Sequence, residues 1–292
     1  MSWYKSRNNA YDHNLSDSLR GAQKQIRPNR NIAEVSATNQ ITAFTSTGLT
    51  LGNAGDANSS NKTYVAWNFK AGGTPSINTD GTITSLVSAN EAAGFSIVSY
   101  SGNSTSGATV GHGLDAAPEL ILFKALNSSA SWIVYSTPGL GDNKYLTLND
   151  THAGVTATNW LNTNSTNFTL NQTFSNCNTS GINYIAYNFT SISGYSKVGT
   201  YTGNGTLGHS IATGFAPGFV IIKMTSASAS WYMFDNKRTT GVYSDQLIAN
   251  SNGAEATGTY VELTSTGFTL ATTAGDLNNN NQTYIYLAIK EN

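Results

Sequence analysis

The side chains that could carry out covalent or metal chemistry are few in this sequence and lie far apart. The single cysteine, Cys177, has no repeated histidine or asparagine partner that could activate it. His112 and His209 each lie beside glycine, and neither neighbours a second histidine or a cysteine, so the spacing of metal ligands is missing. We therefore expect a structural thiol, histidines in turns or edge strands, and no metal or other cofactor.

Acidic residues give no sign of a catalytic pair. Two carboxylates flanking a sugar bond would indicate glycoside hydrolysis, but the 16 acidic residues are scattered along the chain. The sequence has no Gly-X-Ser-X-Gly elbow and no phosphate loop. We predict that the protein is not an enzyme. Its 15 tyrosines could stack on sugars, which leaves a carbohydrate-binding lectin or a glycan-active enzyme as an alternative.

The composition argues against nucleic-acid and membrane partners. Charged residues make up 11% of the 292 residues, the net charge is −1, and no basic stripe runs along the chain. No apolar run approaches the length of a membrane span, and the N-terminal segment has no apolar signal core. We expect no nucleic-acid binding and no insertion into a membrane.

The elements that would have to position a site are repeated along the chain. The heptads 45–51 and 264–270 differ at one position, and 164–170 is a degenerate copy. Each is followed by an asparagine-rich stretch and a closing strand, at 64–69, 184–189 and 284–289. Matching landmarks in the later copies are about 100 residues apart. This spacing predicts a truncated first repeat at 1–70, a linker at 71–93, and complete repeats at 94–192 and 193–292.

Period-two alternation in the closing strands predicts β-strands with one buried face, for example Val65, Trp67 and Phe69. Further strands are expected at 95–100, 119–125, 131–136, 144–149 and 167–171, with equivalents one repeat later. The sequence therefore predicts an all-β protein of tandem antiparallel β-sandwich repeats, jelly-roll-like and about 100 residues long. Two runs, 120–123 and 219–222, are apolar on both faces. They would be covered by a loop or by a neighbouring copy or subunit.

The first repeat lacks the opening strands of the others. Its Trp3 is matched here with Trp132 and Trp231, which leaves no counterpart of residues 94–124 before it. A sheet without its first strands exposes unpaired edges. Another chain could complete it, the linker could fold back over it, or residues 1–70 could adopt a variant fold. We favour completion by another chain, by strand complementation.

Loops that differ most between copies are the best candidates for binding. They are 101–108, 126–130, 138–143, 204–208 and 236–244. The candidate binding residues in them are Asn103, Ser104, Asn127, Asp142, Asn143, Asn204, Lys237, Arg238 and Tyr243.

One stretch of the sequence resembles a known family. It includes Gly94-Phe-Ser-Ile-Val-Ser-Tyr-Ser-Gly-Asn103, Ala117-Pro-Glu-Leu-Ile-Leu-Phe-Lys124 and Gly194-Tyr-Ser-Lys-Val-Gly-Thr-Tyr-Thr-Gly-Asn204. These segments resemble a repeat of virion proteins of tailed phages, especially marine and cyanobacterial phages. The resemblance covers residues 94–292, with residues 1–70 as a truncated copy. It implies a particle component without catalytic residues. The lone cysteine suits a particle assembled in a reducing bacterial cytoplasm.

The resulting hypothesis is a non-enzymatic phage virion structural protein. It would lie on the particle surface as a tail fibre or appendage that acts in assembly and host-surface adhesion. Its partners would be other virion proteins and a host surface glycan, and it would form a homo-oligomer, a trimer if it is a fibre. A capsid decoration (cement) protein is the alternative within the same class.

Overall fold

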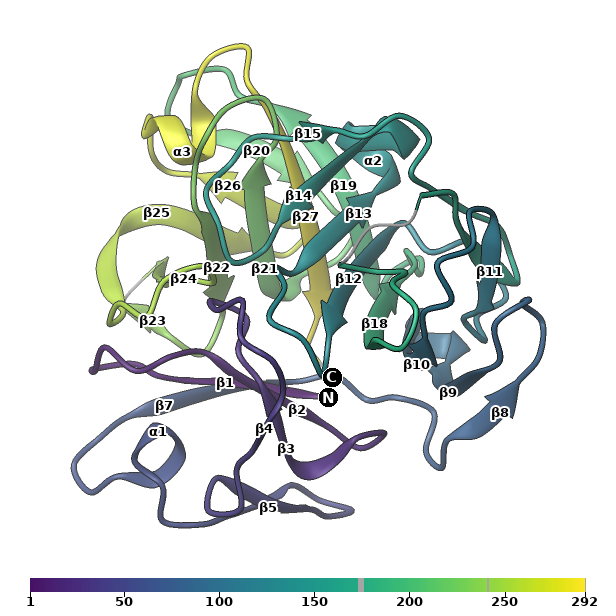
Figure 1. The fold of residues 1–292 in the computed structure, drawn as a ribbon. Helices are drawn as coiled ribbons and strands as arrows, with labels where there is room; N and C mark the ends of the chain where they lie inside the picture. The colour runs from purple at the N-terminus through teal and green to yellow at the C-terminus, as the bar shows by residue number, and fades with distance from the viewer. Residues whose placement is uncertain (173–175, 241, 292) are drawn as a thin grey trace.

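The computed structural model describes residues 1–172, 176–240 and 242–291, and these form antiparallel β-sheets, with only short helical turns between them. The predicted all-β class is confirmed. We call residues 1–70 module 1, 94–192 module 2 and 193–292 module 3. Figure 1 shows the strands of module 1, in purple and blue, at the bottom of the view, with the two later modules above them.

Module 2 has a main sheet and a small second sheet. The main sheet has the order β15-β14-β13-β12-β18-β10-β9-β8, in which β8 (Ser76–Asn78) and β9 (Ser85–Asn90) come from the preceding segment. The small sheet has the order β11-β17-β16. The strands of the module are β10 (Phe95–Ser101), β11 (Ala108–Gly111), β12 (Leu120–Ala125), β13 (Ile133–Ser136), β14 (Lys144–Thr147), β15 (Val155–Thr156), β16 (Leu161–Thr163), β17 (Asn167–Leu170) and β18 (Asn183–Phe189). The five strands predicted here are confirmed. Two short turns, α2 (Thr137–Leu140) and η2 (Gly141–Asn143), follow β13.

Module 3 repeats this order in one continuous sheet, β19-β27-β21-β22-β24-β25-β26-β20, with β23 paired to β24. Its elements are β19 (Ser196–Thr202), β20 (His209–Ala212), β21 (Pro217–Met224), β22 (Trp231–Asp235), β23 (Thr239–Thr240), β24 (Tyr243–Ile248), β25 (Ala256–Thr264), β26 (Gly267–Leu270), α3 (Gly275–Asn278) and β27 (Thr283–Lys290).

Module 1 has fewer strands. Its main sheet has the order β4-β3-β2-β1-β7, and β5 pairs with β6. Its elements are β1 (Ser2–Ser6), β2 (Asn14–Asp17), β3 (Gly21–Ile26), β4 (Val35–Ser36), β5 (Ile41–Phe44), β6 (Leu49–Leu51), α1 (Gly55–Asn58) and β7 (Tyr64–Asn68). β7 is the last strand of its sheet, whereas its counterparts β18 and β27 each have a neighbour on both sides.

The segment 71–93, predicted to be a linker, does more than connect two modules. It contains β8 (Ser76–Asn78), β9 (Ser85–Asn90) and the single turn η1 (Glu91–Ala93). β9 pairs with β10 along its length, and β8 pairs with β9. The segment therefore extends the main sheet of module 2 and protects the outer edge of that sheet.

One hydrophobic cluster is shared by all three modules. It contains Trp67 of module 1, Tyr187 of module 2 and Leu287 of module 3, which occupy matching places in the closing strands. The opposite faces of β18 and β27 line separate clusters inside modules 2 and 3. The prediction of one buried face is therefore wrong for these strands. The face predicted to be buried lies in the central cluster, and the other face is buried in the core of its own module. The run 120–123 is covered in the same way, since Leu122 lies in the central cluster and Phe123 in the module's own core.

A closed ring of hydrogen bonds links the modules through the central cluster. Trp132 Nε1 donates to Arg27 O of module 1 at 2.9 Å, and Trp231 Nε1 donates to Thr147 O of module 2 at 3.0 Å. His13 Nε2 lies 3.1 Å from Ile248 O of module 3 and must donate, because a carbonyl only accepts. We call these three contacts the indole–imidazole ring.

The position equivalent to Trp132 and Trp231 in module 1 is therefore His13. The backbone N–H groups of all three residues donate to an asparagine side chain, at Asn29, Asn149 and Asn250. The match of Trp3 with the two later tryptophans is wrong. Sequence comparison by residue type selected the wrong aromatic residue, because module 1 has histidine where the other modules have tryptophan.

A second set of contacts follows the same cyclic order. Glu34 N donates to Leu126 O at 2.7 Å, Gly154 N to Thr225 O at 2.8 Å, and Glu255 N to Arg7 O at 2.7 Å. The first bond joins module 1 to 2, the second joins 2 to 3, and the third joins 3 to 1. The modules are therefore arranged around a centre rather than end to end.

Three buried lysines occupy matching places in β1, β12 and β21. Lys5, Lys124 and Lys223 have no exposed surface, and each ammonium donates to two backbone carbonyls. Burial lowers the pKa of each from 10.5 to about 8. Each lysine satisfies carbonyls that would otherwise be buried without a partner.

These lysines should make the protein more stable as the pH rises above 8. The folded pKa of Lys124 is lower than the unfolded one, so the unfolded state binds more protons between the two values and stability increases there. We expect a gain of about 1.4 kcal/mol per pH unit from one lysine between pH 8 and 9.5. Urea unfolding of the wild type and of Lys124→Met at several pH values should show a smaller slope in the variant. Equal slopes would contradict this assignment.

Candidate functional site

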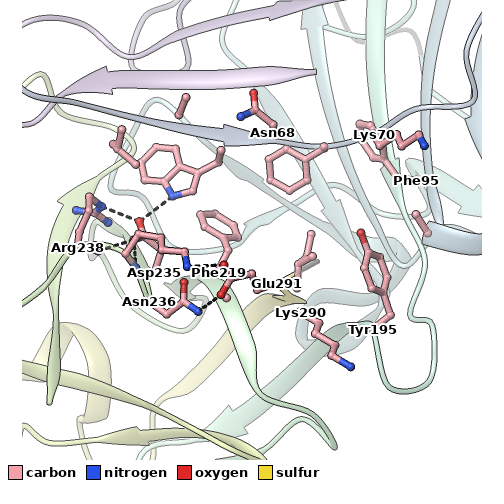
Figure 2. A pocket seen from close by; sticks show the side chains of 18 of the residues that line it. Asn68, Lys70, Phe95, Tyr195, Phe219, Asp235, Asn236, Arg238, Lys290 and Glu291 are labelled. Atoms are coloured by element: carbon pink, nitrogen blue, oxygen red, sulfur yellow. Dashed lines mark hydrogen bonds and ion pairs between the residues drawn. The ribbon is translucent and has the colours of Figure 1, made fainter. Parts of the chain in front are cut away.

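A cavity lies along β7, between modules 1 and 3. Its volume is about 540 Å³, and it is lined by residues 64–70 of module 1, by 235–238 and 289–291 of module 3, and by aromatic residues that include Phe95 and Phe219. Figure 2 shows Asn68 and Lys70 on one side of this space and Asp235, Asn236, Lys290 and Glu291 across from them. We call it the edge groove.

The edge groove lies where modules 2 and 3 each have an additional strand. In module 3, β19 pairs with β27. The turn α2 of module 2 approaches this pair so closely that a Cβ on Gly139 would lie 2.6 Å from Ile285 Cγ2 and 3.5 Å from Thr200 Oγ1. The corresponding segment of module 3, residues 235–238, faces β7 of module 1 in the same way, with the edge groove between them.

The backbone of β7 presents hydrogen-bonding groups to this groove. Phe69 N donates to Met1 O at 2.9 Å and Arg7 N donates to Thr63 O at 2.8 Å. Since antiparallel strands pair through alternate residues, the odd-numbered residues of 63–69 bond to β1. The N–H and C=O groups of Tyr64, Ala66 and Asn68 point to the other side, where the described residues place no strand.

The wall opposite β7 is a network of charges that module 3 shares with module 1. Arg238 binds Asp235 at 2.6 Å and Glu255 at 2.6 Å, and Glu255 also binds Arg7 at 2.7 Å. The indole of Trp67 donates to Asp235 Oδ2 at 2.9 Å, and the Arg238 guanidinium lies 5.4 Å from the ring centroid. The hydrogen bond from Arg7 to Glu255 raises the pKa of that guanidinium. This wall is held in place before anything binds.

The same arrangement occurs between modules 1 and 2. Arg20 binds Asp17 at 2.7 Å and Glu34 at 2.8 Å, and Tyr187 donates to Asp17 Oδ2 at 2.6 Å. Burial favours the neutral carboxyl, but the Arg20 charge and the hydrogen bonds hold the pKa of Asp17 below its usual value. The Asp17 and Arg20 side chains are buried, so this pair is structural there. The network at the edge groove differs in being beside an open space.

Two of the nine sequence-predicted binding residues lie at the edge groove. Lys237 is exposed and pairs with Glu291 at 2.5 Å, whereas Arg238 is buried in the charge network. Tyr243 lies in β24 and pairs with Glu262. The structure does not bring the remaining candidates into one cluster with these residues.

The other predicted residues already use their polar groups to hold loops. Asn103 and Asn204 each accept a hydrogen bond two residues on, from Thr105 N and Thr206 N. The remaining four act across loops: Ser104 accepts from Ser180 N, Asn127 bridges to 181 and 183, Asp142 accepts from Tyr135 and Asn162, and Asn143 accepts from Asn159 N. These hydrogen bonds stabilise the turns and loops in which the residues lie. A role of the residues in binding stays a prediction.

The residues considered for catalysis lie apart from the edge groove. His112 is buried, accepts from Leu114 N and donates to Asn164 O. Burial lowers its pKa. Within the described ranges, no group of three or more histidine, cysteine or acidic side chains is placed to hold a metal ion. No helix in the same residues is long and apolar enough to cross a membrane.

Cys177 should be unreactive in the folded protein. It is fully buried, and burial raises its pKa to about 12. At pH 8 we expect its reaction with a disulfide reagent to be slower than that of a free thiol by about three orders of magnitude. The measurement is the absorbance of released thiolate, with protein unfolded in guanidinium chloride as the control for full reaction. Stoichiometric labelling of the native protein within minutes would contradict the expectation.

The fold and the groove together define an all-β protein of three modules around a shared core, with the free edge of β7 beside the edge groove. The chain belongs to the family described as Domain of unknown function (DUF7483), whose model matches residues 1–292. No curated protein and no solved structure matches the chain.

Proposed function

We propose that this chain is a non-enzymatic structural protein of a tailed-phage particle, exposed on the particle surface and acting by assembly with other virion proteins. The observation that carries the proposal is the open edge of β7 beside a preformed groove. An unpaired strand edge binds extended segments of other chains through main-chain hydrogen bonds. The resemblance of residues 94–292 to phage virion repeats supports the choice of particle.

The shared core supports a mechanical role. Every module contributes side chains to the central cluster and takes part in both cyclic sets of hydrogen bonds. No module can therefore rotate against the others without breaking buried contacts. A rigid unit of this kind transmits force and positions loops. The variable loops then serve host-surface adhesion, with a surface glycan as the ligand.

A capsid decoration protein is the second candidate. The cyclic contacts gather the three modules around a common centre rather than in a row. A compact unit of this kind fits a cap on a shell or the head of an appendage better than the shaft of a fibre.

The test is to locate the chain on purified particles of the phage that encodes it. Gold-labelled antibody against the chain should mark the particle surface in electron micrographs, at the tail for an appendage and over the shell for a decoration protein. Washed particles from which the chain is missing by mass spectrometry would reject the proposal. Polysaccharide cleavage by the purified chain, lost on substitution of one carboxylate, would reject the non-enzymatic role.

A further inference from the structure

Modules 2 and 3 show what fills the place of the edge groove. In both, two consecutive strands joined by a turn supply one strand to each sheet of the sandwich. The two strands do not pair with each other, and we call this segment the hairpin. β10 pairs with β18 and β11 with β17, while β19 pairs with β27 and β20 with β26. Module 1 has the receiving strands, β7 and β6, without a hairpin between them.

The exposure of the receiving residues agrees with this comparison. Leu51 of β6 is 44% exposed, whereas its counterparts Leu170 and Leu270 are fully buried. Ala66 and Asn68 of β7 are exposed, and the equivalent residues of β18 are buried. Module 1 therefore displays apolar and backbone groups that are covered in the complete modules.

The contacts that anchor the hairpin have matching acceptors in module 1. Tyr100 stacks on Tyr184 at 5.3 Å and donates to Cys177 O at 2.7 Å. Tyr201 stacks on Tyr284 at 4.7 Å and donates to Leu277 O at 2.6 Å. In module 1 the corresponding ring is that of Tyr64, and the corresponding carbonyl is that of Ala57.

An asparagine fixes the turn of the hairpin in the same way. Asn178 Oδ1 accepts from Asn103 N at 3.0 Å, and Asn278 Oδ1 accepts from Asn204 N at 3.0 Å. Asn58 has the same orientation, since its Nδ2 donates to Gly52 O as Asn278 Nδ2 donates to Thr272 O. Its Oδ1 is therefore directed toward the position of an incoming turn.

We propose that a partner chain completes module 1 with a two-strand segment of the same sequence class as the hairpin of residues 94–112, one strand bound in the edge groove along β7 and the other along β6. This proposal rests on the assembly role given above and specifies its partner. The hairpin requires a tyrosine at the position of Tyr100, followed by X-Gly-Asn. It also requires a small polar residue at the position of Ser96, which accepts from Asn188 Nδ2 at 3.2 Å. β7 has the matching Asn68.

The hairpin of module 2 is the best probe, because 64–69 (Tyr-Val-Ala-Trp-Asn-Phe) and 184–189 (Tyr-Ile-Ala-Tyr-Asn-Phe) share four of six residues. A synthetic peptide of residues 94–112, labelled with a fluorophore, should bind the full chain saturably at one site in an anisotropy titration. The same peptide with Tyr100→Ala loses the ring contact and the hydroxyl donor. It should bind about tenfold more weakly or worse.

Two further measurements locate the site. Hydrogen exchange should slow at the amides of Tyr64, Ala66 and Asn68 when the peptide is bound. Ala66→Pro removes one outward N–H without touching the bonds to β1, so it should abolish binding. Ala66→Ser, which keeps the N–H, is the matched control and should bind as the wild type does.

Three results would overturn the inference. They are the lack of binding at about 1 mM peptide, equal affinity of the Tyr100→Ala peptide, and protection of amides elsewhere with none along β7. A dimer of the chain that Ala66→Pro converts to a monomer would identify a second copy as the occupant instead. Since particle labelling tests the proposed function separately, peptide failure with labelled particles rejects only the hairpin.

Discussion

Replacing Trp231 with alanine is expected to lower the free energy of unfolding by about 3 to 5 kcal/mol. The side chain is 2% exposed and lies in the central cluster, and its indole donates to Thr147 O of module 2. The substitution leaves a cavity and an unpaired buried carbonyl together. Urea denaturation followed by circular dichroism measures the loss.

Two further expected results test this prediction. Trp231→Phe keeps most of the volume and removes only the hydrogen bond, so it should cost about 1 to 2 kcal/mol. Because the central cluster is common to all modules, the alanine variant should still unfold in one transition, at a lower denaturant concentration. A separate early transition of module 3 would show that the modules are energetically independent and would contradict the shared core.

Acid should destabilise the protein through His13. Burial, together with the charges of Lys5 and Arg238, lowers the pKa of this histidine from 6.5 to about 3. Its neutral form is required, because Nδ1 accepts from Trp3 Nε1 at 2.9 Å while Nε2 donates to Ile248 O. The unfolded state binds a proton below pH 6.5 that the folded state binds only near pH 3. Stability should therefore fall by about 1.4 kcal/mol per pH unit through this window.

The other modules suggest the control for this effect. Leu122 and Trp132 hold the places of Trp3 and His13, so the double variant Trp3→Leu/His13→Trp gives module 1 the pair found in module 2. It keeps an indole donor for Ile248 O and removes the titrating group. Unfolding free energies from pH 6.5 to 4.5 should decline less in the double variant. An unchanged decline would assign the acid sensitivity to other groups, such as His112.

Much of the fold could be predicted from the sequence, because period-two alternation and turn residues are local signals. The strands at 95–100 and 167–171 follow directly from them. The burial of the second face of β18 and β27 could not be predicted, because alternation shows which face of a strand is apolar but not what covers the other face. The apolar run 120–123 did indicate a strand buried on both faces. Burial against a neighbouring copy was one of the two interpretations that the sequence left open.

The site was predicted only in part. The missing opening strands indicated an exposed edge, and the structure places the edge groove there. The variable loops directed attention to residues such as Asn103 and Asn127, whose polar groups hold turns. The pairing of Asp235 with Arg238, three residues apart, also occurs at Asp17 and Arg20. The repeated Asp-X-X-Arg spacing therefore indicated the charge network in the sequence. Comparing which loops differ between copies does not reveal it.

The cyclic order of contacts has a consequence for how the chain matures during translation. Module 1 bonds to module 3 through His13 and Arg7, whose partners are Ile248 and Glu255. The central cluster also needs Ile285 and Leu287 of β27, so it is complete only after β27 has left the ribosome. Until then the apolar faces that modules 1 and 2 turn toward the central cluster remain exposed to water and prone to aggregate. Nascent chains that stall before residue 283 should therefore recruit chaperones, and finished ones should release them.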